Sequence, residues 1–448
     1  MSLYGHTYRR VFLPLYEKLR NRHTCDLTRR AETNQWKSTE DLLAIQLREL
    51  QNILHHAYEQ SPWHRERLEC AGLRPGNLRT LEDFQKLPTM GKDDIREHRD
   101  QMIAQNYHDR LQRHNTGGST GVPLQFYMVQ ESYEWRNAMT VRGYRWAGCA
   151  DGDRQFYLGG APIGRPRWQQ RLKTKLHNSV RRYRTFNSFG LNPQTMNECI
   201  ERINRFRPKT IIGYTNALCL LAQHILENKK KVFRSGALIT AAEGVNDVQR
   251  HLIEQGFQAP VFASYGSREF KLIAMECDRH RGLHLSTENL LIEIVVNDRP
   301  AAPGEIGEIL VTDLHNYGMP FIRYKIGDLG VLAADRCPCG RGLPLLERVE
   351  GRVLDAIRTP EGKIVPGEFF PHLMKEFDTV RQFQVIQEQL QSLRIKLVLR
   401  EGDASAQLQR MEQEIKRVLG DSITINLERV PEIPLTKSGK FRVTVSQL

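Results

Sequence analysis

The chain has 448 residues, with 40% hydrophobic residues, 26% charged residues and a net charge of +13. This composition is that of a globular protein with a sizeable core, and the length predicts two domains, with three as the upper bound. No run of eighteen apolar residues occurs, which excludes a membrane-spanning helix, and the first twenty residues lack the apolar core of a signal peptide. We therefore expect a cytoplasmic protein.

The positive charge does not by itself identify a partner. The basic residues are spread along the chain without a recognisable nucleic-acid-binding motif, so no nucleic acid is expected as a partner. Three readings stay open: a solvated basic surface, attraction for anionic nucleotides, or weak peripheral contact with a membrane. The basic residues among the first forty leave weak peripheral membrane contact possible. The sequence carries no signal for the oligomeric state.

Residues 1–110 are predicted to form a helical lead-in. Residues 1–36 have a helical, basic pattern. The segment from Ser38 to Asp41 is typical of a helix N-terminus, and leucines at helical spacing after it predict a long amphipathic helix ending near residue 61. A loop at 72–76 and a short helix starting near Thr80 are expected next.

A stretch rich in glycine and hydroxyl residues follows this lead-in. Its members are Thr116, Gly117, Gly118, Ser119, Thr120 and Gly121. Such a backbone can fold around an anion with amide and hydroxyl donors pointing at it, and a polyphosphate is the expected ligand. The stretch is neither a Walker A motif nor GxGxxG, and taken alone it is more often a flexible turn. Alternating apolar residues at 122–128 predict a strand after it.

Strands and helices alternate between residues 125 and 264. Strands are predicted at 155–158, 209–214, 237–240 and 260–264, and helices at 217–226 and around 248–254. This alternation favours a parallel sheet covered by helices, in which ligands bind at the carboxyl ends of the strands. We expect the stretches 240–244 and 264–269 there, with the 116–121 loop as a third candidate.

The pattern changes to β-hairpins from residue 288 and again near residue 350. Strands at 291–297 and 307–313 are expected to pair. Beyond 350 we predict a hairpin around 360–362, strands at 393–399 and 423–427, and a helix at 406–419. The predicted fold class is α/β. A large domain, residues 1–350, holds the mostly parallel helix-covered sheet and a β-hairpin subdomain, and a hinge joins it to a small α+β domain, residues 351–448.

Five motifs occur along the chain in a definite order, which is more specific than any one of them. They are the 116–121 loop, Tyr265-Gly266-x-x-Glu269, Arg323-Tyr324-x-x-Gly327-Asp328, Gly351-Arg352 and Ser438-Gly439-Lys440. Together they resemble the adenylate-forming (acyl-CoA synthetase-like) superfamily. Within it, the chain is most similar to the phenylacetate–CoA ligase-like branch and its CapK-like subgroup, and the similarity covers essentially the whole chain.

The resemblance implies a role for each motif. Residues 116–121 would hold the β- and γ-phosphates of ATP; Ala242 and Glu243 would border the adenine, and Tyr265, followed by Gly266, would stack on it. Glu269 would hold Mg²⁺, for which a carboxylate is a suitable hard ligand. Asp328 would accept hydrogen bonds from both ribose hydroxyls, with Arg352 nearby. Lys440, on a mobile small domain, would reach the α-phosphate and the attacking carboxylate, where it would act catalytically with Glu269.

The implied reaction is AMP-forming ligation: a small-molecule carboxylic acid becomes an acyl-adenylate, and the acyl group passes to coenzyme A. Two alternatives stay open, namely transfer to an amine or hydroxyl acceptor in capsular or exopolysaccharide biosynthesis, and nucleotide binding without turnover. Two positions depart from the relatives. Leu354 stands where an aspartate is common, with Asp355 one place later, and Arg268 precedes Glu269 where Thr or Ser is frequent.

Three cysteines and a histidine in two separate segments are candidate zinc ligands. Cys337 and Cys339 form a Cys-x-Cys pair, and Cys277 is followed by His280 and His284. Four nitrogen and sulfur ligands suit a structural tetrahedral Zn²⁺. CapK-like relatives share both segments, which favours zinc, with His284 preferred over His280 as the fourth ligand. The alternative is a set of unrelated buried thiols.

Overall fold

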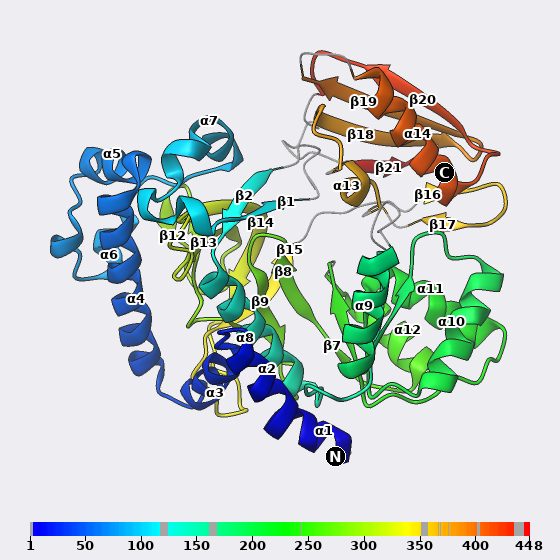
Figure 1. Cartoon of the computed structure of the whole chain (residues 1–448), viewed down its shortest axis with the longest axis horizontal. Coiled ribbons are helices and arrows are strands. Elements are labelled where there is room, and N and C mark those ends of the chain that lie inside the picture. Colours follow the sequence, from blue (N-terminus) through cyan, green and yellow to red (C-terminus); the bar gives the residue numbers. More distant parts are fainter. Residues whose placement is uncertain are drawn as a thin grey trace. The chain divides into compact units, whose positions relative to one another are not determined.

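The structure is a computed structural model, and it describes residues 3–116, 124–160, 168–242, 244–350, 357–365, 367, 369–374, 376–400, 404–433 and 443–448. The chain divides into two compact units. The first comprises Met1–His114, Gln125–Gly152 and Phe262–Gly351, and the second comprises Asn115–Leu124, Asp153–Val261 and Arg352–Leu448. Figure 1 labels their helices and strands.

The first unit begins with the predicted helical lead-in. Its elements are α1 (Leu3–Thr7), a π-helical turn (Tyr8–Phe12), α2 (Leu13–Leu19), α3 (Thr24–Asn34), α4 (Thr39–Gln60), α5 (Pro62–Cys70), a 3₁₀ turn (Pro75–Asn77), α6 (Leu81–Gln85), α7 (Lys92–Met102) and a second 3₁₀ turn (Gln105–Arg110). The long helix is confirmed as α4: Ser38 caps it by accepting a hydrogen bond from the Asp41 amide. The short helix expected near Thr80 is α6, and the Thr80 side chain caps it.

An antiparallel sheet of eight strands forms the body of the first unit. Its order is β12-β11-β13-β14-β15-β10-β9-β8. The strands are β8 (Ser264–Ser267), β9 (Lys271–Glu276), β10 (Leu283–Leu285), β11 (Leu290–Val296), β12 (Arg299–Pro300), β13 (Gly307–Asp313), β14 (Tyr324–Leu332) and β15 (Leu345–Glu350). The predicted hairpin is confirmed by the pairing of β11 with β13 from Leu290 opposite Asp313 onward.

Helix α8 (Gln130–Trp146) lies against this sheet and is fixed to it by two buried ion pairs. Arg136 pairs with Asp313, and Arg142 binds both carboxylate oxygens of Glu288 at 2.7 Å. A buried charge is tolerated only when it is paired in this way. Gly143 favours the close approach of α8 to β9, because a Cβ there would lie 2.6 Å from a Leu272 methyl carbon, which would have to move.

The second unit contains the predicted parallel sheet. Its order is β4-β3-β5-β6-β7, and the β3–β4, β3–β5 and β5–β6 pairs are parallel. The strands are β3 (Gln155–Gly159), β4 (Tyr183–Asn187), β5 (Thr210–Tyr214), β6 (Ala237–Ala241) and β7 (Val261–Phe262), with helices α9 (Trp168–Val180), α10 (Pro193–Phe206), α11 (Thr215–Glu227) and α12 (Asp247–Phe257). The fold class is confirmed.

Two predictions about this sheet need correction. The strand expected at 260–264 is two strands, because β7 belongs to the parallel sheet whereas β8 is an edge of the antiparallel one. The stretch 264–269 is therefore mainly strand rather than a loop at a carboxyl end. The 116–121 loop joins β1 (Gln112–Asn115) to β2 (Gln125–Met128), which form a separate two-stranded sheet, so it does not follow a strand of the parallel sheet.

The C-terminal part of the second unit is the predicted α+β fold. Its elements are β16 (Ile357–Arg358), β17 (Ile364–Val365), α13 (Phe369–Met374), β18 (Val380–Gln389), β19 (Ser392–Leu399), α14 (Ser405–Leu419), β20 (Thr424–Arg429) and β21 (Thr444–Ser446). The order β20-β19-β18-β21 mixes one antiparallel pair with two parallel pairs. One hydrophobic core contains residues of this part and of the parallel-sheet part. Separate domains at 1–350 and 351–448 therefore stay a prediction.

Candidate functional site

The two ends of the glycine-rich loop are held together by backbone pairing. The Thr116 amide donates to the Leu124 carbonyl at 2.8 Å, and the Leu124 amide donates to the Thr116 hydroxyl oxygen at 3.0 Å. Thr116 is 5% exposed. Because the Thr116 amide already donates to Leu124, Thr116 would donate to a phosphate through its hydroxyl group. Residues 117–121 lie outside the described residues.

Tyr265 and Asp328 meet although three strands separate β8 from β14 in the sheet order. The Tyr265 hydroxyl donates to Asp328 Oδ2 at 2.9 Å. The antiparallel sheet must therefore curl strongly, as twisted sheets do. An ionised carboxylate offers about four lone-pair sites, so Asp328 can accept from this phenol and from ribose hydroxyls together.

Glu269 follows the strand that carries Tyr265. It is 5% exposed, and its Oε1 lies 3.4 Å from the Tyr324 hydroxyl. No cation pairs with it among the residues that the structure describes. Next to it, Phe270 is fully buried and contacts the rings of Phe321 and Tyr324. This anchor fixes the backbone at Glu269, and a buried carboxylate of this kind is suited to a bound cation.

Gly266 has a steric reason for being glycine. The pairing of β8 with β9 shifts register between Tyr265 and Gly266. A Cβ at Gly266 would lie 2.0 Å from the Lys271 carbonyl oxygen. The glycine therefore lets the two strands approach closely between Tyr265 and Glu269.

Ala242 lies at the carboxyl end of β6, where the parallel sheet was expected to bind its ligand. Its φ is +68°, in the left-handed region that an alanine rarely adopts. Strained backbone of this kind is concentrated at ligand sites. Glu243, Arg352 and Lys440 lie outside the described residues. In the first unit, the structure brings together Tyr265, Gly266, Glu269 and Asp328. Thr116 and Ala242 are described in the second unit.

The sequence interpretation missed the roles of two residues in the Arg323-Tyr324 motif. Tyr324 is the hydroxyl neighbour of Glu269. Arg323 has a φ of +53°, is 3% exposed, and its guanidinium lies 3.2 Å from Glu293 carboxylate oxygens. It also donates to the Gln85 carbonyl at 2.6 Å. The motif arginine thus ties the lead-in to the sheet, a role that no spacing pattern reveals.

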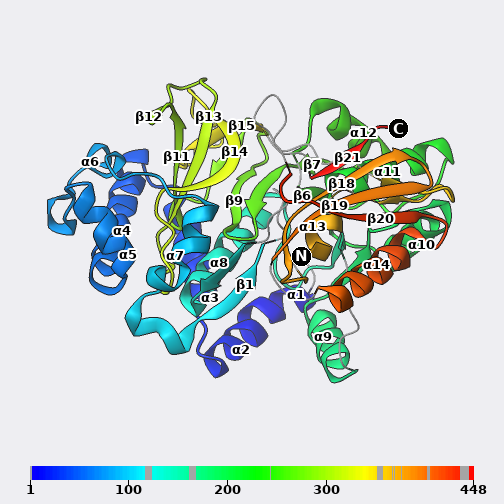
Figure 2. The same cartoon turned by 90° about the horizontal axis from the view of Figure 1, so that it is seen from above.

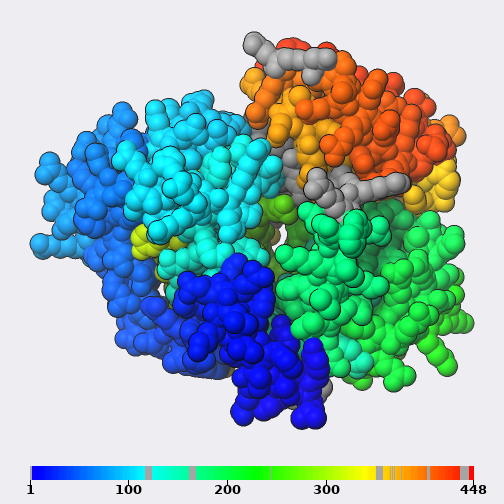
Figure 3. Space-filling view, viewed as in Figure 1, coloured from blue at the N-terminus to red at the C-terminus, as the bar shows by residue number. Residues whose placement is uncertain are grey.

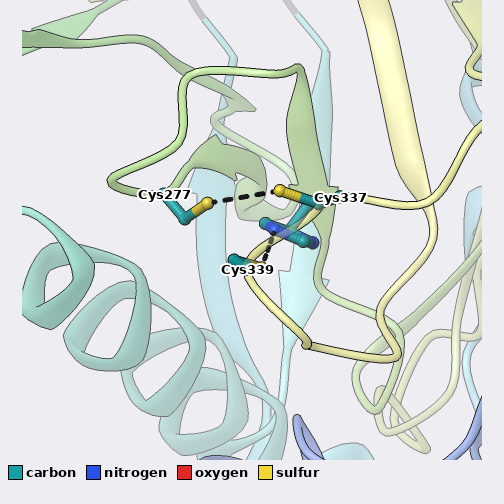
Figure 4. A group of neighbouring side chains, drawn as sticks. Cys277, Cys337 and Cys339 are labelled. Atoms are coloured by element: carbon teal, nitrogen blue, oxygen red, sulfur yellow. Dashed lines mark hydrogen bonds between the residues drawn. The ribbon is translucent and has the colours of Figure 1, made fainter.

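The three cysteines and His284 form one cluster, drawn in part in Figure 4. Their ligand atoms all lie within 4.8 Å of one another, with Cys277 Sγ 3.7 Å from Cys337 Sγ and Cys339 Sγ 3.3 Å from His284 Nε2. All of these cysteines are free thiols. His280 lies apart from the cluster contacts and hydrogen-bonds Glu276 at 3.0 Å.

The hydrogen bonds and burial around the cluster favour the forms of its side chains that bind a metal cation. Backbone amides two residues along donate to Cys277 and Cys339, from Arg279 and Arg341 respectively, each at 3.5 Å. His284 Nδ1 lies 3.3 Å from the Leu343 carbonyl oxygen, so a proton there leaves Nε2 to face Cys339. Burial lowers the pKa of His284 to about 4, which keeps its ring neutral, the form that binds metals.

Comparison with known proteins finds similarity over most of the chain. The family described as CapK C-terminal domain matches residues 357–447. Protein CapK of Staphylococcus aureus is 25% identical over 436 residues, covering 93% of this chain and 92% of that protein. A phenylacetate-coenzyme A ligase of Escherichia coli (strain K12) is 25% identical over 434 residues, covering 91% and 95%.

Solved structures support the fold. 2-Hydroxyisobutyryl-CoA ligase, in complex with 2-HIB-AMP and CoA in the thioesterification state, has a TM-score of 0.62 and 21% identity, covering 92% of this chain and 91% of that chain. The same ligase in its postadenylation state has a TM-score of 0.59. These matches show that the chain is similar, over about nine-tenths of its length, to CapK and to phenylacetate-coenzyme A ligases, and that it shares the fold of 2-hydroxyisobutyryl-CoA ligase.

Proposed function

We propose that the chain is an AMP-forming ligase that activates a carboxylic acid with ATP and transfers the acyl group to coenzyme A. The observation that carries the proposal is the meeting of Tyr265 and Asp328 at 2.9 Å across a curled sheet, with buried Glu269 four residues after Tyr265. A nucleoside triphosphate can be bound by an aromatic ring that stacks on its base, an acceptor for its two ribose hydroxyls and a carboxylate that holds its Mg²⁺. Relatives named as phenylacetate-coenzyme A ligases, matched over about nine-tenths of this chain, support the choice of acceptor.

Each side chain has a defined task in this proposal. The Tyr265 ring stacks on adenine, and Asp328 accepts the ribose hydroxyls. Thr116 and the loop after it donate to the β- and γ-phosphates. Glu269 holds Mg²⁺, which when bound neutralises phosphate charge; the absence of a cationic partner for this buried carboxylate among the described residues fits that task.

The reaction has two displacement steps. A carboxylate oxygen of the acid attacks the α-phosphorus, the bond between that phosphorus and the bridging oxygen breaks, and pyrophosphate leaves. The thiolate of coenzyme A then attacks the acyl carbon, and AMP leaves with the former carboxylate oxygen. Lys440 is assigned to the first step, where its charge stabilises the negative charge that develops on the phosphorus oxygens.

A pyrophosphate-release assay over a panel of aliphatic and aromatic carboxylates tests this function. We expect one class of acid to stimulate release, and Lys440→Ala to reduce that rate by orders of magnitude while AMP binding is kept. If no acid stimulates release and Lys440→Ala changes nothing, the ligase proposal is wrong, and AMP binding by the same protein would then identify nucleotide binding without turnover. A product formed without coenzyme A but with an amine or hydroxyl acceptor would instead identify the alternative acceptor class.

We further propose that Cys277, His284, Cys337 and Cys339 hold a structural Zn²⁺. In a tetrahedral site with Zn–S of about 2.3 Å, two sulfurs lie about 3.75 Å apart, close to the 3.7 Å between Cys277 and Cys337. Four protein ligands fill the coordination sphere, which is typical of a structural rather than a catalytic site. The ion would join the turn after β9 and strand β10 to the loop after β14.

A further inference from the structure

Helix α9 (Trp168–Val180) buries none of its 13 residues. Its four large apolar side chains are all exposed: Trp168 is 71% exposed, Leu172 60%, Leu176 66% and Val180 44%. These residues recur every four positions. At about 100° per residue, they form one continuous stripe about 120° wide along the helix.

Other helices of the same unit show how unusual this is. Helix α10 buries Cys199, Ile200 and Ile203, and α12 buries Ile253 and Phe257. Their apolar faces lie against the unit, whereas Figure 2 shows α9 at its outer edge, and the surface over α9 is on the face seen in Figure 3. A contiguous exposed apolar surface marks an interaction site.

Positive charge flanks the stripe on both sides. On a helical projection Lys173 borders one edge, and Arg171 and Lys175 border the other. Basic residues continue after the helix at Arg181, Arg182 and Arg184. The sequence has no acidic residue between Asp153 and Glu198. The flanking side chains can therefore extend beside the apolar stripe while their charges stay in water.

We propose that α9 is an interfacial helix that binds the surface of an anionic lipid bilayer, with its apolar stripe inserted among the acyl chains and its basic flanks on the headgroups. At 1.5 Å per residue the helix is about 20 Å long and cannot cross a hydrocarbon core of about 30 Å. No helix in the described part of the chain is long and apolar enough to span a membrane.

The charge pattern selects this partner over two others. A second copy of the chain docked stripe to stripe would bring the basic flanks of both helices together, and like charges repel. A nucleic acid would satisfy the basic residues but leave Trp168, Leu172 and Leu176 against water. An anionic bilayer satisfies both features. The inference does not depend on the proposed ligase activity.

Co-sedimentation with vesicles tests the proposal. The full chain is mixed with vesicles of phosphatidylcholine alone or with one quarter phosphatidylglycerol, at low and at high salt. We expect binding to the anionic vesicles that weakens as salt rises. The variant Leu172→Glu/Leu176→Glu should lose at least about tenfold in partitioning, because charge replaces the inserted stripe. Its matched control is Leu226→Glu/Val248→Glu, which alters exposed residues of α11 and α12 with the same change in charge and should bind as wild type.

Two further variants sharpen the test. Lys173→Gln and Lys175→Gln should each reduce partitioning into anionic vesicles about fivefold, because each basic residue near the surface contributes about 1 kcal/mol. The emission of Trp168 should shift to shorter wavelength on binding, and the shift should vanish in Trp168→Phe.

Three results would overturn the proposal. The wild-type chain could stay in the supernatant with anionic vesicles at low salt. The stripe variant could bind as well as wild type, which would move the contact elsewhere, such as to the exposed residues Leu3, Val11, Phe12, Leu15 and Leu19. Light scattering could find a wild-type dimer that the stripe variant makes monomeric without vesicle binding, which would identify an interface between copies.

Discussion

Replacing Gly266 by alanine should disturb the proposed nucleotide site through backbone sterics alone. The new Cβ would start 2.0 Å from the Lys271 carbonyl oxygen, whereas real Cβ atoms essentially never approach closer than 3.0 Å. Strands β8 and β9 must therefore separate by about 1 Å. Overpacking of this kind costs about 1–3 kcal/mol of unfolding free energy. The displaced strand carries Tyr265, whose stack on a base is worth roughly 1–3 kcal/mol, so the Kd for AMP should rise about tenfold.

Calorimetric titration with AMP and denaturant unfolding measure both effects without knowledge of the acid substrate. The matched control is Gly76→Ala, because a Cβ at Gly76 would have no other atom within 4 Å and the residue has no positive φ. This control should keep both AMP affinity and stability. If Gly266→Ala binds AMP within a factor of two of wild type while its stability falls, the strand pair does not position a nucleotide. If neither property changes, the steric argument is wrong.

Three other changes have defined outcomes. Asp328→Asn should raise the Kd for AMP about tenfold to a hundredfold in the same titration, because hydrogen bonds to a charged acceptor are worth about 1.5–3 kcal/mol; an unchanged Kd would remove Asp328 from the ribose site. Metal analysis of the purified chain should find about one equivalent of zinc, reduced strongly in Cys337→Ser and kept in Cys25→Ser; less than a tenth of an equivalent in wild type would defeat the zinc proposal. Burial lowers the pKa of His64 to about 3, so as pH falls the unfolded chain takes up this proton before the folded one does. The stability from neutral His64 is full above about pH 6.5 and is lost toward pH 3 at about 1.4 kcal/mol per unit, and His64→Gln should flatten the measured slope of unfolding free energy in that window.

The sequence was sufficient for the elements whose signals are local. Ser38 and Thr80 mark the starts of α4 and α6 through their capping side chains, and strands β3, β5 and β6 follow from runs of β-branched and apolar residues. Strand β18, like strand β4 and helices α8, α9 and α10, was not predicted. Its pairing with β19 and β21 depends on residues far along the chain, which no local pattern contains.

The site was predictable in its residue types but not in its geometry. Spacing along the chain placed Tyr265 near Glu269, yet nothing local indicates that Tyr265 would reach Asp328, 63 residues later, because that contact depends on the curl of the sheet. The sequence already favoured His284 over His280, and the fold groups His284 with the three cysteines. The exposure of α9 could not be predicted from the sequence either, because an apolar stripe on a helix is usually buried and only the fold shows that this one is uncovered.

The fate of one oxygen atom tests the central claim of acid adenylation most directly. An acid found active in the pyrophosphate assay is supplied with both carboxylate oxygens labelled with ¹⁸O, together with ATP and coenzyme A, and the nucleotide product is analysed by mass spectrometry. Attack on the α-phosphorus predicts AMP carrying one ¹⁸O atom. Unlabelled AMP, or ADP with the label in inorganic phosphate, would contradict it.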